Sequence, residues 1–300
     1  MMANKHAYLI IAHKSDETFY TLLQLLDDSM NDIYVHMDIK NDSFSENTWR
    51  PKYSHLYYTE RTNVTWGGYS QIRAELILLN DAIKRQYRYY HLLSGEDLPI
   101  KTQQEIHQFF DSCGDKIFVD FYSDHFTNFD RVRYYHLFQE YLGRRNTFFA
   151  NRLFINMQRV LHINRNQGIR FAKGANWFSI PHDFAVYVVS KKQWIMHTFK
   201  DSFCCDEVFL QTVLINSQFI DRLFYQGFDN NTVSMMREID WKRGDPYVFR
   251  IDDLQQLKTS DRMFARKFNS KIDVAIINAV KQYIMNTQMN HSQIASGDGN

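Results

Sequence analysis

The adjacent acids Asp206 and Glu207 are the residues of this sequence best suited to catalysis. They stand immediately before an apolar run, 208–210, which predicts a helix that begins at the two acids. The positive end of a helix dipole stabilises a carboxylate in its charged form, and an ionised carboxylate beside an apolar site can act as a general base. The alternative is that the pair only caps an ordinary helix.

A second group of chemically capable residues lies in the segment 242–271, where eight cations outnumber four acids. The cations are Lys242, Arg243, Arg250, Lys258, Arg262, Arg266, Lys267 and Lys271. Arginine offers phosphate oxygens a planar fork, and lysine offers them a compact point charge. A run of charges is usually a solvated face, but Phe264 and Phe268 flank Arg266 and Lys267, which favours partial burial and a phosphate site.

Length and composition limit the class of protein. The 300 residues are 44% hydrophobic and 16% aromatic, which suffices for one large domain or two tightly joined ones. A net charge of +1 argues against nucleic acid as a partner. The three cysteines, Cys113, Cys204 and Cys205, favour a reducing compartment over a disulfide framework. No signal-peptide pattern and no apolar stretch of about 18 residues occurs, so we expect a cytoplasmic protein, at most peripheral to the inner face of the cell membrane.

Strands and helices are predicted to alternate in the first 121 residues. The predicted strands are 7–12, 32–38, 54–58, 89–93 and 116–121, and the predicted helices are 17–27, 70–86 and 102–110. This order predicts an α/β fold, with a mostly parallel twisted sheet flanked by helices on both faces. Polar residues follow three of the strands, at His13, Asp38 and the turn 94–97. Ligands bind at the carboxyl ends of such strands, so these positions predict a binding site.

The segment 122–173 is predicted to be a basic amphipathic excursion from this fold. Nine basic residues between positions 131 and 173 oppose a single acid, Glu140. Within 144–162, one helical face would carry Phe149, Leu153, Met157 and Val160, and the other would carry Arg152 and Arg159. Such a helix can lie on an anionic membrane, and the alternative is that it only packs on the domain.

Six segments occur in an order that resembles one enzyme family. They are 7–13 (Ala-Tyr-Leu-Ile-Ile-Ala-His), 34–38 (Tyr-Val-His-Met-Asp), 64–70 (Val-Thr-Trp-Gly-Gly-Tyr-Ser), 91–100 (His-Leu-Leu-Ser-Gly-Glu-Asp-Leu-Pro-Ile), 205–207 (Cys-Asp-Glu) and 263–268 (Met-Phe-Ala-Arg-Lys-Phe). Over residues 5–285 the chain resembles the core-2/I-branching β-1,6-N-acetylglucosaminyltransferase family, glycosyltransferase family 14, which also holds peptide O-xylosyltransferases. The resemblance implies a GT-A-like fold, a UDP-sugar donor, inversion at the anomeric carbon and no metal ion, in a bacterial-type member.

The resemblance also implies roles for single residues. Glu207 would be the general base, and Lys267 would contact the leaving diphosphate together with Arg243, for which Lys242 is the alternative. Donor binding is implied for His13, Tyr34, Val35, Asp38, Gly67, Gly68, Ser94 and Asp97, with Glu96 as the alternative to Asp97. Acceptor binding is implied for Trp177, Trp241 and Asp206. For the two tryptophans the alternative is a structural aromatic, and for the glycine pair it is a simple turn.

The sequence carries its own argument about metal. Many GT-A enzymes hold a cation with an Asp-x-Asp triplet, but none occurs here, and Glu238-Ile239-Asp240 only approaches one. Cationic side chains can stabilise a leaving diphosphate in place of a metal ion. We therefore expect neither a metal site nor a cofactor.

The expected organisation is one transferase domain at 1–285 and a flexible tail at 286–300. The domain would comprise a nucleotide-binding half at 1–121, the excursion at 122–173, and an acceptor and catalytic half at 174–285. The expected function is inverting, metal-independent transfer of N-acetylglucosamine, or else xylose, from a UDP-sugar to a glycan or lipid-linked glycan. A non-catalytic sugar-nucleotide or glycan-binding protein and a metal-dependent transferase stay open as alternatives.

Overall fold

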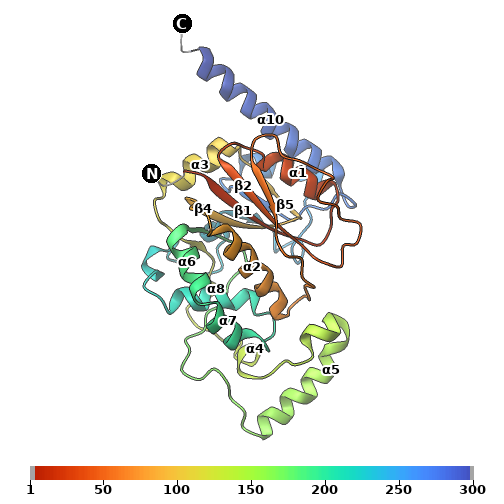
Figure 1. Ribbon diagram of the computed structural model, residues 1–300, viewed down its shortest axis with the longest axis vertical. Coiled ribbons are helices and arrows are strands. Elements are labelled where there is room, and N and C mark those ends of the chain that lie inside the picture. Colours follow the sequence, from red (N-terminus) through yellow and green to blue (C-terminus); the bar gives the residue numbers. More distant parts are fainter. Residues whose placement is uncertain (1–3, 298–300) are drawn as a thin grey trace.

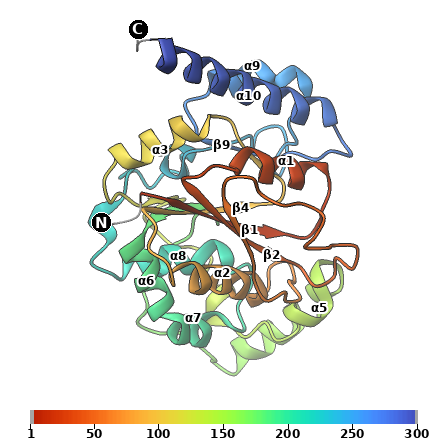
Figure 2. The same ribbon diagram turned by 45° about the horizontal axis from the view of Figure 1, so that its top comes forward.

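The protein contains a six-stranded main sheet flanked by helices (Figures 1 and 2). Its structure is a computed structural model that describes residues 4–297, without the side chains of 141–150 and 291–297. The strand order is β3-β2-β1-β4-β7-β6, in which β3, β2, β1 and β4 are parallel and β7 is antiparallel to both of its neighbours. The strands are β1 (His6–Ala12), β2 (Asn31–Met37), β3 (His55–Tyr58), β4 (Tyr89–Ser94), β6 (Phe118–Val119) and β7 (Phe178–Pro181). The predicted α/β class is thereby confirmed.

Helices cover both faces of this sheet. One face carries α1 (Glu17–Leu26), α3 (Gln103–Ser112) and α10 (Val274–Gly297), and the other carries α2 (Tyr69–Ala82), α6 (His182–Ser190), α7 (Lys192–Phe199) and α8 (Asp206–Ile215). The central strand β1 is buried on both sides, because alternate side chains of a strand point to opposite faces. Ala7 and Leu9 pack with α2 and α8, whereas Tyr8 and Ile10 pack with α1 and α3.

A second, three-stranded sheet joins the C-terminal segment to the turn after β4. Its order is β5 (Asp97–Pro99), β9 (Phe264–Arg266) and β8 (Arg237–Ile239), with β9 antiparallel to β5 and parallel to β8. The remaining helices are α4 (Asp130–Arg133), α5 (Gln139–Val160), α9 (Leu254–Thr259) and the 3-10 turns η1 (Ile220–Arg222), η2 (Thr232–Met235) and η3 (Ile251–Asp253). The cationic segment was predicted to bind phosphate. The small sheet places this segment at the carboxyl edge of the main sheet.

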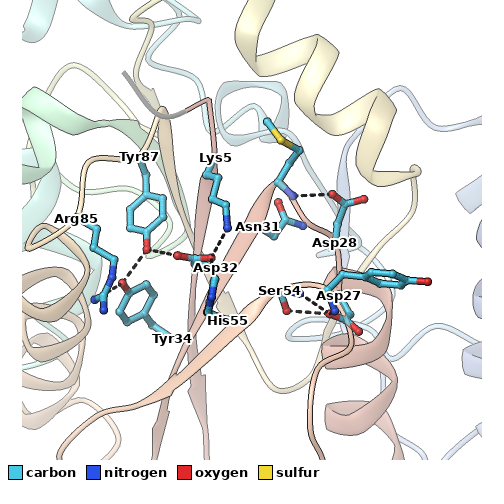
Figure 3. Close-up of polar contacts among 12 residues, drawn as sticks. Lys5, Asp27, Asp28, Asn31, Asp32, Tyr34, Ser54, His55, Arg85 and Tyr87 are labelled. Carbon is cyan, nitrogen blue, oxygen red and sulfur yellow. Dashed lines mark hydrogen bonds and ion pairs between the residues drawn. The ribbon is translucent and has the colours of Figure 1, made fainter. Parts of the chain in front are cut away.

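Hydrogen bonds fix the amino end of β2 (Figure 3). Asp32 accepts from Lys5 at 3.0 Å, from His55 at 3.1 Å and from Tyr87 at 2.6 Å. Asp27, before the strand, accepts from the backbone N–H groups of residues 52–54. These bonds tie β2 to the segment that leads into β3 and to the base of β4.

Two predicted elements have other bounds in the structure. The strand predicted at 116–121 is reduced to Phe118–Val119, because Ile117 pairs with Leu223 and Asp120 turns away to bind Ser234 and the Ala175 N–H. The tail expected at 286–300 is helical to Gly297, since α10 starts on a buried apolar stripe and continues past it. Residues 298–300 lie outside the described residues.

Candidate active site

The carboxyl ends of β1, β2 and β4 open into a cavity of about 690 Å³. His13, Asp38 and Ser94 line this cavity, at the strand ends where the sequence analysis expects a binding site. The chain passes from β3 through α2 to β4 on the far side of β1, so the strand order reverses between β1 and β4. Parallel sheets bind ligands at such a point. Burial lowers the pKa of His13, which keeps its imidazole neutral at neutral pH.

Two lysines hold Glu96 between them on the wall of the cavity. Lys14 Nζ lies 3.0 Å from Oε1, and Lys267 Nζ lies 2.9 Å from Oε2. Burial acts to raise the pKa of Glu96, but Lys267 and then Lys14 outweigh it and hold the pKa below its ordinary value. The small sheet brings these groups together, because the Phe268 N–H donates to the Glu96 carbonyl at 2.8 Å.

Arg266 forms a second anchored cation beside Lys267. Its Nη1 donates to Asp97 Oδ1 and to Ser94 Oγ, both at 2.6 Å. Its guanidinium carbon lies 4.1 Å from the ring centroid of Trp177, a cation–π contact. Asp97 is buried behind Arg266, whereas Arg266 and Trp177 line the cavity. The alternative donor ligand, Glu96, lines the cavity directly.

Glu207 lies on the same cavity, at the first turn of α8. Its Oε2 accepts from Arg131 Nη1 at 2.8 Å and lies 3.3 Å from Lys173 Nζ. Within the described part of the chain, no donor is hydrogen-bonded to the other oxygen, Oε1. Both cations lie on Oε2, which leaves Oε1 to accept a proton from an incoming hydroxyl. A third of this side chain is exposed, so an acceptor can reach it.

Asp206 differs from its neighbour because it is buried. It accepts from Gln71 Nε2 at 3.0 Å, and it makes no N-cap bond, since Cys205 is the N-cap residue of α8. Burial raises the pKa of Asp206 to about 7, and the charge of Glu207 adds to the rise. The positive end of a helix favours ionised carboxylates, as predicted for this pair of acids, but at Asp206 the loss of solvation exceeds this effect.

The structure brings most of the predicted site residues together on the cavity. These are His13, Asp38, Ser94, Glu96, Trp177, Asp206, Glu207, Trp241 and Lys267. Tyr34 and Val35, expected around the uridine, lie in the core instead, where the Tyr34 hydroxyl bonds that of Tyr87. Their strand is covered by helices on both faces, so neither side chain reaches the cavity.

Arg243 and Lys242 also lie off the cavity lining. Arg243 is held by Asp240 and, at 2.7 Å, by Asp253, and it stacks on Tyr247. These contacts engage its charge locally, while Lys242 is exposed beside it. On the cavity side of this region lie Arg266 and Lys267 of β9 and its continuation.

The glycine pair contacts protein where the sequence analysis expects a ligand. A Cβ on Gly68 would lie 2.6 Å from a Glu140 oxygen, and one on Gly67 would lie 3.1 Å from Cys204 Sγ. The φ angle of Gly67 is +73°, a conformation that favours glycine. The pair therefore permits the start of α5 to pack against the start of α2, where the Ser70 N–H donates to Glu140 at 2.8 Å.

Several residues of the site were missed by the sequence analysis. Lys14 and Lys40 follow strand ends, which is a signal that could have found them. Arg131 and Lys173 belong to the basic segment 122–173, whose charges the sequence analysis assigned to one excursion. Their use at Glu207 required the fold, because neither residue has a local pattern that points to α8.

Three carboxylates of the cavity, those of Asp38, Glu96 and Glu207, have cationic partners, and Asp38 has Lys40 at 3.3 Å. Elsewhere in the described residues, ligand atoms of His6, His107 and Asp111 lie within 4.8 Å of one another. This trio lies at the amino end of β1, opposite the cavity. The ring centroids of His6 and His107 lie 3.9 Å apart with the rings tilted by 35°, and His6 Nε2 lies 3.3 Å from Asp111 Oδ1, so the three side chains form a packed hydrogen-bonded group.

A mostly parallel sheet, with a cavity at its switch point that is lined by carboxylates and cations together, is consistent with a GT-A-like glycosyltransferase domain. The sequence model of the Core-2/I-Branching enzyme matches residues 6–261. The chain therefore belongs to the Core-2/I-branching enzyme family, a family of glycosyltransferases.

Three curated relatives show how far the similarity extends. The chain is 24% identical over 288 residues to the xylosyltransferase sqv-6 of Caenorhabditis briggsae, and 24% identical over 286 residues to that of Caenorhabditis elegans. Each match covers 86% of this chain and 34% of the relative, so the chain spans about a third of their length. It is 21% identical over 309 residues to an N-acetyllactosaminide beta-1,6-N-acetylglucosaminyl-transferase of Mus musculus, covering 96% of this chain and 75% of that protein.

Proposed function

We propose that this chain is an inverting, metal-independent glycosyltransferase, which moves N-acetylglucosamine or xylose from a UDP-sugar to a hydroxyl of a glycan acceptor. One observation carries the proposal: a single cavity is lined by a carboxylate suited to a general base, Glu207, and by a lysine suited to a leaving diphosphate, Lys267. Family membership supports the reaction class, and the names of the relatives supply the two candidate sugars.

In the proposed reaction Glu207 takes the proton of an acceptor hydroxyl. The hydroxyl oxygen then bonds the anomeric carbon from the face opposite the diphosphate. The bond between that carbon and the diphosphate oxygen breaks, and its electron pair leaves with UDP. Lys267 stabilises the charge that develops on the leaving group. A single displacement needs one base and one such stabiliser, unlike the two carboxylates of a glycosidase.

The pairing of charges in the cavity supports the absence of a metal requirement. Each acid that could ligate a cation near the strand ends has a basic partner: Asp38 with Lys40, Asp97 with Arg266, and Glu96 with Lys14 and Lys267. A divalent cation would have to displace these partners to gain its oxygen ligands. The same lysines can turn toward phosphate oxygens, for which they are suitable donors.

A donor screen tests the proposal and separates it from its alternatives. The protein is mixed with UDP and with a panel of UDP-sugars in millimolar EDTA, and thermal stability and release of UDP are measured. We expect UDP-N-acetylglucosamine or UDP-xylose to stabilise the protein and a glycan acceptor to trigger UDP release. Stabilisation without turnover across a broad acceptor panel would favour a binding protein. Activity lost in EDTA and restored by Mn²⁺ would favour a metal-dependent transferase, with Glu96 and Asp97 as its candidate ligands.

We further propose that α5 contacts an anionic membrane, at the inner face of the cell membrane, where a lipid-linked glycan would be the acceptor. The helix lies at the periphery, away from the main sheet (Figures 1 and 2). Leu153, Val160 and Leu161 are 66%, 77% and 61% exposed, and Arg152 is exposed beside them. Part of the positive charge is used internally, since Arg159 pairs with Asp130. In the described chain, no helix combines the length and apolarity that a membrane span requires.

A further inference from the structure

Glu75 lies beneath the candidate active site, and no cation of the described residues pairs with its carboxyl group. It lies in α2, one turn after Gln71, and its side chain is fully buried. Among the described residues, neither Oε1 nor Oε2 has a hydrogen-bond partner. An isolated ionised carboxylate in a core is strongly unfavourable, so a group in this setting binds a proton instead.

Asn176 also has a buried polar atom that lacks a partner among the described residues. Its side chain lies within hydrogen-bonding reach of Glu75, and its Oδ1 is buried with no partner in the described chain. Asn176 also lines the cavity, between Ala175 and Trp177. A carboxylate and an amide oxygen both only accept hydrogen bonds, so the two groups can satisfy each other only if the acid supplies an O–H donor.

The backbone around Asn176 is held on its amino side. Asp120 Oδ2 accepts from the Ala175 N–H at 3.2 Å, and the Ala175 carbonyl accepts from Gln211 Nε2 at 2.8 Å. These backbone bonds fix the position from which the Asn176 side chain extends. The orientation of its amide group then depends on the partner that binds Oδ1. An amide whose oxygen points into the core presents its Nδ2 donor to the cavity.

We propose that Glu75 is a neutral acid whose hydroxyl donates to Asn176 Oδ1, and that this bond directs Asn176 Nδ2 into the cavity as a donor to an oxygen of the bound sugar. Glu75 is then a positioning residue and Asn176 a specificity-determining one. The inference rests on the proposed transferase function only for the identity of the ligand as a sugar. The protonated state of Glu75 does not depend on it.

The surroundings of Glu75 support the neutral form. Burial, and after it the charge of Asp206, raises the pKa of Glu75 well above its ordinary value, and the two outweigh a hydrogen bond from Asn176, which acts to lower that pKa. Among the described groups, Asp206 is the charged neighbour that acts on it, from the first turn of α8. Burial also raises the pKa of Asp206 itself to about 7. Glu75 and Asp206 are buried near each other, so both cannot ionise readily. Gln71 favours ionisation of Asp206, because its Nε2 donates a hydrogen bond to that carboxylate.

Two measurements test the protonated acid without any turnover. The infrared carbonyl band of a protonated carboxyl group is expected at pH 7 in the wild type and absent in Glu75→Gln. Because the folded pKa is raised, the contribution of Glu75 to stability is present below its unfolded pKa of about 4.5 and is lost as the pH rises. Glu75→Gln is therefore expected to match the wild type near pH 4 and to be the more stable protein at pH 8.

Asp81→Asn is the matched control, since Asp81 lies on the same helix but pairs at the surface with Lys84. It should leave the infrared band in place. Repeating the pH series in an Asp206→Asn background separates the titration of Glu75 from that of its neighbour. A missing band in the wild type, or a Glu75→Gln protein no more stable at pH 8, would overturn the neutral-acid assignment and leave Glu75 as an anion that accepts from Asn176 Nδ2.

Donor affinity tests the positioning role. Glu75→Leu keeps a side chain of similar size but removes the O–H donor to Asn176. Asn176→Ala removes the amide that is proposed to bind the sugar. Each should weaken the binding of a UDP-sugar about tenfold, as expected for one hydrogen bond, with little change for UDP alone. The double variant should be no worse than either single one, because both changes remove the same contact. Additive losses, or equal losses for UDP alone, would overturn the role even if the infrared band is present.

Discussion

Two acids on the cavity, Glu96 and Glu207, each contact two cations, but they differ in which carboxylate oxygens make the contacts. Glu96 uses both of its oxygens, one for Lys14 and one for Lys267, and its side chain is 9% exposed. Glu207 receives both cations on one oxygen, and its side chain is 34% exposed. Charge alone does not distinguish the two sites, whereas burial and the use of the second oxygen do.

This difference indicates distinct tasks for similar clusters. A buried acid with both oxygens engaged fixes its partners in space, so Glu96 holds Lys267 where a diphosphate can meet it. A partly exposed acid with one oxygen available can exchange a proton with an incoming hydroxyl, so Glu207 can act as a base. Variants at Glu207, Lys267 and Glu96 test this division of roles, and a change in α5, expected to leave the chemistry intact, completes a series that runs from the largest expected effect to the smallest.

Glu207→Gln should have the largest effect on turnover. The change keeps the size of the side chain but removes its basicity, so kcat should fall at least ~100-fold, as expected for lost general-base assistance. Binding of UDP, measured by calorimetry, should change little. Near-normal turnover would show that Glu207 is not the general base. The different settings of Glu96 and Glu207 would then not reflect different roles in catalysis.

Lys267→Ala should weaken UDP binding and slow transfer, each by about tenfold, because the leaving group loses a charged hydrogen bond. Arg243→Ala is the informative partner variant. Family resemblance assigns Arg243 to the diphosphate, but its contacts with Asp240 and Asp253 predict a smaller effect. Equal losses of UDP affinity in both variants would show that Arg243 leaves its acids to bind the donor.

Glu96→Gln should mainly lower the free energy of unfolding. Its effect on proton transfer to Glu207 should be smaller. The folded pKa of Glu96 is lowered, so its contribution is present above the unfolded value of 4.5 and is lost as the pH falls through the folded pKa. At pH 7 the free energy of unfolding should drop by about 1.5–3 kcal/mol, the range for charged hydrogen bonds. Denaturant curves should show the difference from the wild type shrinking below pH 4.5. Glu207→Gln, partly exposed, serves as the control with a smaller loss.

The membrane contact should have the smallest effect on chemistry. Wild-type protein should cosediment with anionic but not neutral vesicles, and the binding should weaken with salt, which screens exposed charges beyond about 10 Å at 0.1 M. Arg152→Glu with Val160→Ser should abolish the binding and leave transfer to a soluble acceptor intact. Lys271→Glu, at an exposed position outside α5, is the control. Equal binding to neutral vesicles would leave α5 as a packing element.

The sequence by itself determined the elements whose signals are local. The apolar run of β1 predicted a parallel strand buried on both faces, and polar residues at strand ends predicted the cavity edge at His13, Asp38 and Ser94. The acids at the start of α8 and the cationic run 242–271 were found from residue type and neighbours. These features follow from periodicity and composition within a few residues of chain, whereas the choice of Lys267 within the run rested on the family resemblance.

Only the tertiary structure decided which charges meet. Arg131 and Lys173 belong to one basic segment in the sequence, yet they reach Glu207 across 76 and 34 positions of the chain. Arg243 and Arg266 lie in one cationic run, but β9 carries Arg266 to the cavity while nearby acids hold Arg243 outside it. Burial likewise separates Asp206 from Glu207, since Asp206 is buried and the side chain of its neighbour is 34% exposed. The physical reason is that solvation and ion pairing depend on distances in space, which local pattern does not specify.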